Sequence, residues 1–184
     1  MKLVLVTILF LIFFINIGNF LDVTKSPEKL DVIVSLGIGA DRTAVGVDLL
    51  KKSYASSNKY YFVGIKMIFD IHMKEKNIDS SMISDNIIYI NHMKNTMDEI
   101  NYIDKNIATM YDNIIIITDP PHSLRVDFMI KQFTKNLKGK YIIVSSEPTW
   151  WDSQYYFLNQ KAIVFSMQEI TKIFYNYFKY TFYF

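Results

Sequence analysis

The sequence predicts an α/β protein with a doubly wound, mostly parallel five-stranded sheet, preceded by one N-terminal transmembrane helix. Strand-like segments rich in Ile, Val and Tyr alternate about five times with segments of helical spacing. The four consecutive isoleucines of Ile114–Ile117 are typical of a strand that is covered on both faces, as in parallel sheets. At 184 residues, the chain has room for one such domain and an anchor.

Strands and helices are expected to follow one another along the chain. The strands are predicted at Asp31–Leu36, Lys59–Ile65, Asn86–Ile90, Asn113–Thr118 and Tyr141–Val144. Five helices are predicted. The first ends near Lys52, and the others cover Met67–Lys76, Thr96 to about Tyr111, Ser123–Leu137 and Gln160–Tyr180. Asp119-Pro120-Pro121 should break the fourth strand, because proline has no N–H for the ladder.

The N-terminus carries Leu3–Leu21, nineteen positions without a charge, which is close to the roughly 20 residues that span a bilayer. A cleaved signal peptide is the rival, but this region offers little of the small-residue pattern that cleavage requires. We therefore favour an uncleaved signal anchor (residues 1–22), a linker (23–30) and one domain (31–184). Lys2 favours a cytoplasmic N-terminus and an external domain, although Lys25 and Lys29 beyond the span weaken this bias.

Charge and composition exclude several classes of function. A net charge of +2 with scattered lysines gives no basic face for nucleic acid. The absence of cysteine excludes disulfides, thiolate zinc sites and a cysteine nucleophile. Protein partners cannot be named from the sequence.

Polar residues gather after the predicted strands, where open α/β sheets bind ligands. Two arginines and a histidine next to helix N-termini predict a pocket for a phosphate or carboxylate, in which His122 is a candidate general acid or base. Few carboxylates accompany them, which disfavours a dedicated metal cage. The candidate residues are Gly37, Gly39, Arg42, Gly64, Asn95, Thr96, His122 and Arg125.

Structural alternatives exist for several of these residues. The lone G-x-G of Gly37 to Gly39 lacks the third glycine of a dinucleotide fingerprint, and a tight turn explains it equally well. Arg42 could pair with its neighbour Asp41. Thr96 and Glu99 have the spacing of a capping box.

Two further segments are ambiguous. The tryptophans of Glu147–Trp151 could cover the site or close the core, and we favour the core. The aromatic tail Tyr175–Phe184 could pack on the sheet, meet a partner or touch lipid.

Several motifs occur in a recognisable order. Leu36-Gly37 is followed by Arg42, Gly64 ends the second strand, Asn95-Thr96-Met97-Asp98-Glu99 follows the third, and Ile117–Val126 carries Thr118, His122 and Arg125. In this order the chain resembles the YdcF/SanA/ElyC family of bacterial α/β proteins, over roughly Asp31 to Lys179. The resemblance implies a Rossmann-like fold and adds Asp98 and Glu99 to the ligand-binding candidates. These two residues depart from the family pattern, which has Glu and Asn at their positions.

The resemblance also implies a place in the cell. Anchored members sit in the bacterial inner (cytoplasmic) membrane as single-pass proteins, with the domain facing the periplasm or cell exterior. Family roles concern peptidoglycan and the polyprenyl-phosphate carrier. We therefore expect a small anionic or lipid-linked ligand. A binding module without turnover is the alternative. S-adenosylmethionine, which one branch is said to bind, is disfavoured because the first glycine loop is truncated and no clear acidic ribose partner follows the second strand.

Overall fold

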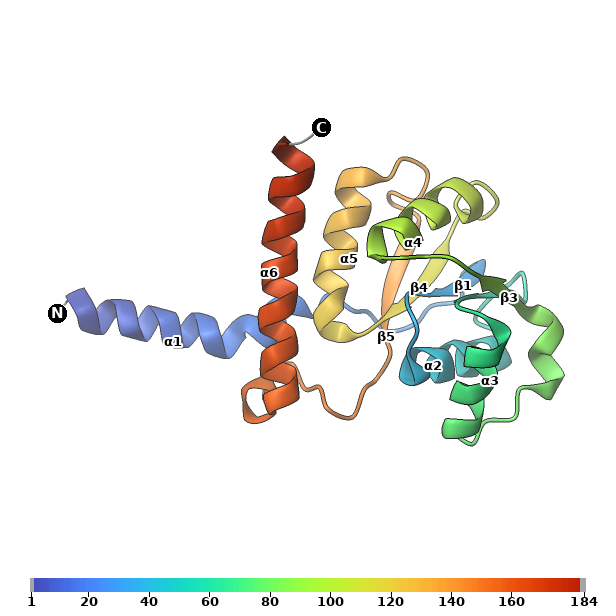
Figure 1. Cartoon of the computed structure of the whole chain (residues 1–184), viewed down its shortest axis with the longest axis horizontal. Coiled ribbons are helices and arrows are strands. Elements are labelled where there is room, and N and C mark those ends of the chain that lie inside the picture. The colour runs from blue at the N-terminus through green and yellow to red at the C-terminus, as the bar shows by residue number, and fades with distance from the viewer. Residues whose placement is uncertain (1, 183–184) are drawn as a thin grey trace.

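The computed structural model describes residues 2–182, so Met1 and the last two positions of the predicted aromatic tail lie outside the described residues. Its centre is a five-stranded sheet in the order β3-β2-β1-β4-β5, in which every neighbouring pair is parallel (Figure 1). This confirms the predicted α/β class and strand locations. The strands are β1 (Val32–Ser35), β2 (Tyr60–Val63), β3 (Ile87–Ile90), β4 (Ile114–Thr118) and β5 (Tyr141–Ser145).

Helices cover both faces of the sheet, which explains the continuous apolar runs in the strands. Ile33 of β1 packs into one core cluster with residues of α2 (Ala40–Lys51) and α3 (Lys66–Glu75). Its neighbours Val32 and Val34 pack on the opposite face. That second face is covered by α4 (Thr96–Tyr102), the π-helical turn η2 (Ile103–Ile107) and α5 (Pro120–Phe133).

The strand order places the topological switch point of the sheet between β1 and β4. The chain leaves β1 toward one face through α2, and it leaves β4 toward the other face through α5. The loops after these two neighbouring strands therefore diverge. Such a switch point is where open α/β sheets bind ligands.

The closing helix α6 (Gln160–Phe182) forms a third layer, because α5 already covers the sheet there. Phe128 and Phe133 of α5 stack against Tyr177 and Tyr180 of α6, with ring centroids 6.3 and 4.8 Å apart. Tyr177 and Tyr180 of the aromatic tail thus pack on a helix and not on the sheet, whereas Tyr175 and Phe178 are exposed. Nearby, Trp150 and Trp151 belong to a small core together with Tyr156 of the short helix η3 (Tyr156–Leu158), as the core-closing interpretation predicted.

The N-terminal helix α1 (Lys2–Leu21) projects from the domain (Figure 1). Its stretch Val4–Leu21 has a mean hydropathy of 2.5 and is long and apolar enough to cross a membrane, a test that a signal sequence would also pass. Only its base is buried, where Ile17 and Leu21 pack against Tyr156 and Ala162. Within the helix the Asn16 side chain donates to the Ile12 carbonyl (2.7 Å), so this amide has a partner inside the apolar stretch.

The segment 23–30, predicted as a linker, contains no helix or strand apart from a single β-bridge between Leu30 and Ala55, but it follows the domain closely. The Val23 N–H donates to Ser123 Oγ (2.9 Å), and the Lys25 N–H donates to the Ile143 carbonyl (2.8 Å). The base of α1 is therefore tied to α5 and to the edge strand β5.

The helix predicted to run to about Tyr111 is shorter, because α4 ends at Tyr102 and η2 ends at Ile107. Both boundaries of α5 also differ from the prediction. Helix α5 begins at Pro120 rather than Ser123, since proline fits the first helical position, where no N–H is required. It ends at Phe133 rather than Leu137. There the Asp104 carboxylate of η2 accepts the backbone N–H groups of Lys135, Asn136 and Leu137 at 3.1, 2.7 and 2.8 Å, and so supports a non-helical path. The remaining short helix is η1 (Ser81–Asn86).

Candidate functional site

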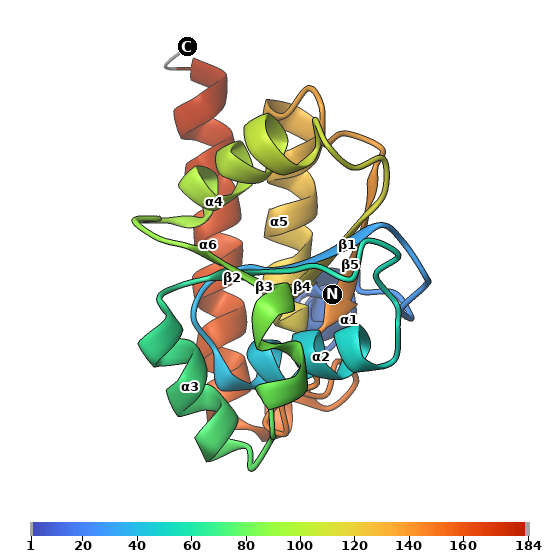
Figure 2. The same cartoon turned by 90° about the vertical axis from the view of Figure 1, so that its right-hand side faces the viewer.

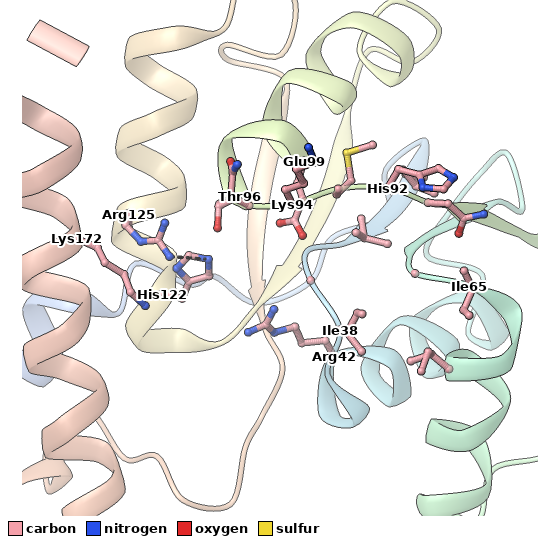
Figure 3. A pocket seen from close by; sticks show the side chains of 18 of the residues that line it. Ile38, Arg42, Ile65, His92, Lys94, Thr96, Glu99, His122, Arg125 and Lys172 are labelled. Carbon is pink, nitrogen blue, oxygen red and sulfur yellow. Dashed lines mark hydrogen bonds between the residues drawn. The ribbon is translucent and has the colours of Figure 1, made fainter. Parts of the chain in front are cut away.

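A cavity of about 590 Å³ lies at the carboxyl edge of the sheet, between the loops that follow β1, β2, β3 and β4 (Figure 3). Helix α6 closes it on one side through Phe165, Glu169 and Lys172. The cavity brings together eight of the ten residues that the sequence nominated as ligand-binding; their role as ligands stays a prediction. The eight are Gly37, Arg42, Gly64, Asn95, Thr96, Glu99, His122 and Arg125.

The other two nominated residues serve the local fold. Gly39 is the N-cap of α2, and its carbonyl accepts the Thr43 N–H (2.9 Å) and the Thr43 hydroxyl (2.8 Å). Asp98 is turned toward the first turn of α4, where Oδ2 accepts the Lys94 N–H (3.2 Å) and the Asn95 amide (3.1 Å). Neither residue lines the cavity.

The turn after β1 requires glycine at position 37. Its φ of +66° lies in the left-handed region, which favours glycine. A Cβ added there would lie 2.7 Å from Arg42 Nη1 and 3.8 Å from Glu99 Oε1. Gly37 therefore allows an arginine and a carboxyl group to share the space above its backbone, so the G-x-G turn contributes to the site directly.

Arg42 spans the switch point between β1 and β4. Its Nε and Nη2 atoms donate to the two carboxylate oxygens of Asp119 at 2.9 and 2.6 Å, and Nη1 donates to the Leu36 carbonyl. The alternative pairing with Asp41 is wrong, because Asp41 pairs with Lys76. Ser146 after β5 also donates to Asp119, at 2.7 Å. These contacts fix the guanidinium at the floor of the crevice.

The cap of α4 differs by one residue from the prediction. Asn95 is the N-cap, and its side chain accepts the Asp98 N–H at 3.1 Å. The expected pair of Thr96 and Glu99 is wrong, because Asn95 is the N-cap and Asp98 is its partner. Asp98 Oδ2 accepts from the Asn95 side-chain amide and from the Lys94 N–H, and not from the Asn95 backbone N–H as in a full capping box. This shift leaves Glu99 free to point into the cavity, as Figure 3 shows.

Glu99 is a buried carboxyl group of the cavity with a raised pKa. Burial raises its pKa from 4.5 to about 7, against the opposing effects of Arg42, a Gly37 backbone hydrogen bond and Arg125. Only 8% of the residue is exposed. A carboxyl group of this kind can donate or accept a proton under physiological conditions.

A buried cluster around Glu169 forms the wall nearest to α6. Its Oε2 atom accepts from Arg125 Nε (2.7 Å) and from His122 Nδ1 (3.0 Å), and Oε1 accepts from Lys172 Nζ (2.8 Å). Glu169 is 1% exposed. Burial alone would raise its pKa, but the hydrogen bonds and charges of His122 and Arg125 outweigh burial and lower it. Glu169 therefore stays ionised.

His122 is neutral at physiological pH. Burial lowers its pKa from 6.5 to about 4, although the hydrogen bond to Glu169 acts in the opposite direction. Because a carboxylate only accepts, Nδ1 carries the hydrogen, and Nε2 is the acceptor that faces Arg125 Nη2 at 3.5 Å. The general acid or base role predicted for His122 stays a prediction, and among these two groups it is Glu99 that titrates near neutral pH.

Glu169 and Lys172 were missed by the sequence analysis. Glu169 is the one acidic residue between Gln160 and Tyr180, and it shares the buried face of α6 with Ala162 and Ser166. A lone charge on the buried face of an amphipathic helix is the signal that could have identified it. No such signal distinguishes Lys172 from the other lysines of α6.

The charges around the cavity favour an anion. Within the described chain, four basic side chains line it, against two carboxyl groups. One of these carboxyl groups is Glu99, whose pKa burial raises to about 7, which favours its neutral form. Among the described residues, no group of three or more His, Asp or Glu side chains is arranged to hold a metal ion. The basic side chains are Arg42, Lys94, Arg125 and Lys172.

Neither a scan against models of known protein families nor a search of curated proteins finds a match to this chain. The resemblance to the YdcF/SanA/ElyC family therefore stays a prediction from the motifs. The function of the chain has to be inferred from its fold and from the geometry of its cavity.

Proposed function

We propose that this protein is held in a membrane by α1 and binds a small anionic, phosphate-bearing ligand in the cavity at the carboxyl edge of its sheet. The observation that carries this proposal is the excess of basic side chains over ionised carboxylates on the cavity lining. A cavity of about 590 Å³ is also within the usual size range for a small-molecule site.

The two arginines support the proposal because they are held in place and still have donors to offer. A guanidinium carries five N–H groups. Asp119 and Leu36 use three of those on Arg42, while Glu169, His122 and Met129 engage Arg125. The carboxylates of Asp119 and Glu169 fix the orientation of the two guanidinium groups. The remaining N–H groups can then bind phosphate oxygens without reorganisation.

A lipid-linked ligand fits the apolar N-terminal helix. Anchoring by α1 would keep the cavity close to a bilayer, where carriers such as polyprenyl phosphate reside. The resemblance to the YdcF/SanA/ElyC family supports a role in peptidoglycan or lipid-carrier metabolism at the bacterial inner membrane. Lys2 supports an orientation with the domain outside the cytoplasm.

Turnover of the bound ligand is a second candidate function, and the protonation of Glu99 favours it. In hydrolysis of a phosphate ester, water forms the new bond to phosphorus while the ester oxygen leaves. Glu99 would give its proton to that oxygen, and the basic side chains would stabilise the charge on the phosphoryl group. The attacking water would keep one hydrogen on the new phosphate and release its other proton to solvent, from which Glu99 would be protonated again.

Binding can be tested by thermal shift on the full-length protein in detergent, with pyrophosphate, farnesyl phosphate and S-adenosylmethionine as probes. A phosphate probe at 100 times its dissociation constant should stabilise the wild type by about 2.7 kcal/mol. Lys94→Gln and Lys172→Gln should each weaken binding about fivefold, which corresponds to roughly 1 kcal/mol for a charge at a solvent-exposed rim.

Lys66→Gln is the matched control for this experiment, because Lys66 is exposed, pairs with Asp70 and does not line the cavity. It should bind phosphate probes like the wild type. Equal affinity in all three variants would contradict the proposed site. If only S-adenosylmethionine raises the melting temperature, the proposed phosphate ligand is wrong and the cavity binds that cofactor.

Turnover is tested separately by phosphate release from farnesyl phosphate. Glu99→Gln should keep binding and lose release, because the amide keeps the shape of the carboxyl group but has no proton to give. If the wild type binds the probe and releases no phosphate, the protein is a binding module for that ligand.

A further inference from the structure

The outer face of α6 combines exposed apolar side chains with two lysines, Lys161 and Lys179. Val164, Met167, Phe174, Tyr175 and Phe178 recur at helical spacing and are between 37 and 60% exposed. Aromatic side chains beside lysines are typical of helices that lie in the interface of a bilayer.

The lysines lie along one border of this outer face. Lys161 Nζ lies 4.6 Å from the centre of the Trp150 ring, and Lys179 Nζ lies 5.5 Å from that of Tyr175. The one acidic residue between Gln160 and Tyr180 is Glu169, which is buried on the opposite side of the helix. The outer face is therefore positive, which suits anionic lipid headgroups better than a neutral surface.

The position of α1 places this face toward a membrane. In Figure 1, α1 leaves the domain on the side of α6 away from α5, and α6 runs across it. In Figure 2, which looks toward α1 from the opposite side of the domain, α6 again stands across the view. The two helices are held together where Ile17 and Leu21 pack against Tyr156 and Ala162. If α1 runs along the bilayer normal, α6 must then lie along the bilayer surface.

We propose that the outer face of α6 lies on the surface of the membrane that α1 enters, with its aromatic side chains among the lipid headgroups. This inference rests on the proposed function in one respect, the insertion of α1 in a bilayer. It also deepens that function. The inner side of α6 carries Glu169 and Lys172 into the cavity, so a single helix separates the ligand site from the headgroup layer. The substrate class that this arrangement fits is a phosphate attached to a membrane lipid.

The test uses single cysteines, because the natural chain has none. Val164→Cys and Tyr175→Cys on α6 are labelled with an environment-sensitive fluorophore in the full-length protein. Matched controls are Ile71→Cys and Met67→Cys on α3, which have the same exposure (52 and 61%, against 50 and 60%) on the far side of the domain. Leu9→Cys reports whether α1 itself enters the bilayer.

The labelled proteins are reconstituted in phosphatidylcholine vesicles with about one quarter phosphatidylglycerol, an anionic lipid that attracts lysines. Lipids brominated near the ester group are added as quenchers. We expect loss of fluorescence at Val164 and Tyr175, none at Ile71 and Met67, and weaker loss at Tyr175 without phosphatidylglycerol.

Three results would overturn the inference, and they are distinguishable. Quenching at Leu9 without quenching at Tyr175 would show a domain that stands away from the membrane. Disulfide cross-links between two copies of unlabelled Tyr175→Cys, together with no quenching of the labelled protein, would show that a second protein chain covers this face. Absence of quenching at Leu9 would refute the membrane insertion of α1. The phosphate-binding experiment in detergent does not depend on that insertion.

Discussion

Glu99 and His122 should have opposite effects on the pH dependence of folding. Burial raises the pKa of Glu99 from 4.5 to about 7, so the folded protein binds this proton more tightly than the unfolded chain, and the folded state loses stability as pH rises across that interval. Burial lowers the pKa of His122 from 6.5 to about 4, so stability is lost as pH falls. Each shift corresponds to about 3 kcal/mol at 1.36 kcal/mol per pH unit.

Because the two intervals overlap, the two effects should nearly cancel between pH 4.5 and 6.5, and a variant at either residue should reveal the effect of the other. Glu99→Gln should lose about 2 kcal/mol of unfolding free energy from pH 7 to pH 4.5, owing to His122. His122→Asn should lose a similar amount in the opposite direction, from pH 4.5 to pH 7, owing to Glu99.

The assay is urea unfolding of the full-length protein in detergent, followed by the fluorescence of Trp150 and Trp151 at each pH. The slope against pH is the measurement, so a uniform loss of stability in either variant does not affect it. Asp70→Asn, at an exposed ion pair, should follow the wild-type curve. If the curves of Glu99→Gln and His122→Asn run parallel to the wild type, burial does not shift these pKa values and the reasoning is refuted.

Two further predictions concern the walls of the cavity. Glu169→Gln should cost about 3 kcal/mol in urea unfolding at pH 7, because it leaves the buried Arg125 guanidinium without its counter-charge, whereas Asp70→Asn should cost less than about 1 kcal/mol; equal costs would show that the buried cluster does not stabilise the fold. Gly37→Ala should cost about 1–2 kcal/mol for its left-handed backbone and should also weaken phosphate binding by displacing Arg42. Gly139 also has a positive φ, but a Cβ added there would meet no atom within 4 Å, so Gly139→Ala should keep full affinity for phosphate. An equal loss of affinity in both alanine variants would contradict the role of Gly37.

Much of the fold could be predicted because a short stretch of consecutive residues is enough to indicate that a strand is buried. The isoleucines of β4 are all buried, and a strand covered on both faces needs an uninterrupted apolar run. The position of α6 could not be predicted in this way. Its amphipathic pattern indicates that one side is buried, but the same pattern would suit packing on a sheet or on a helix. Here α5 covers that face of the sheet, so α6 packs on α5 and on the base of α1.

The candidate site was predicted in part for a related reason. Glycines, prolines and polar residues after the strands mark the carboxyl edge, and parallel strands bring that edge together whatever the loops contain. Which side chain pairs with which was not predictable. The cap of α4 moved by one residue, from Thr96 to Asn95, and that single step decides whether Glu99 binds its own helix or faces the cavity.

The sequence by itself determined the apolar N-terminal helix, the five parallel strands and the gathering of Arg42, His122 and Arg125 at one edge of the sheet. These features depend on local composition and on the spacing of apolar residues along short segments of the chain. The tertiary structure decided that Asp119 holds Arg42, that Glu169 holds His122 and Arg125, and that Glu99 titrates near neutral pH. Each of these features depends on burial or on contact with a residue that is distant in the sequence. Ion pairing and desolvation are set by distances in the folded protein, and these distances cannot be obtained from the sequence alone.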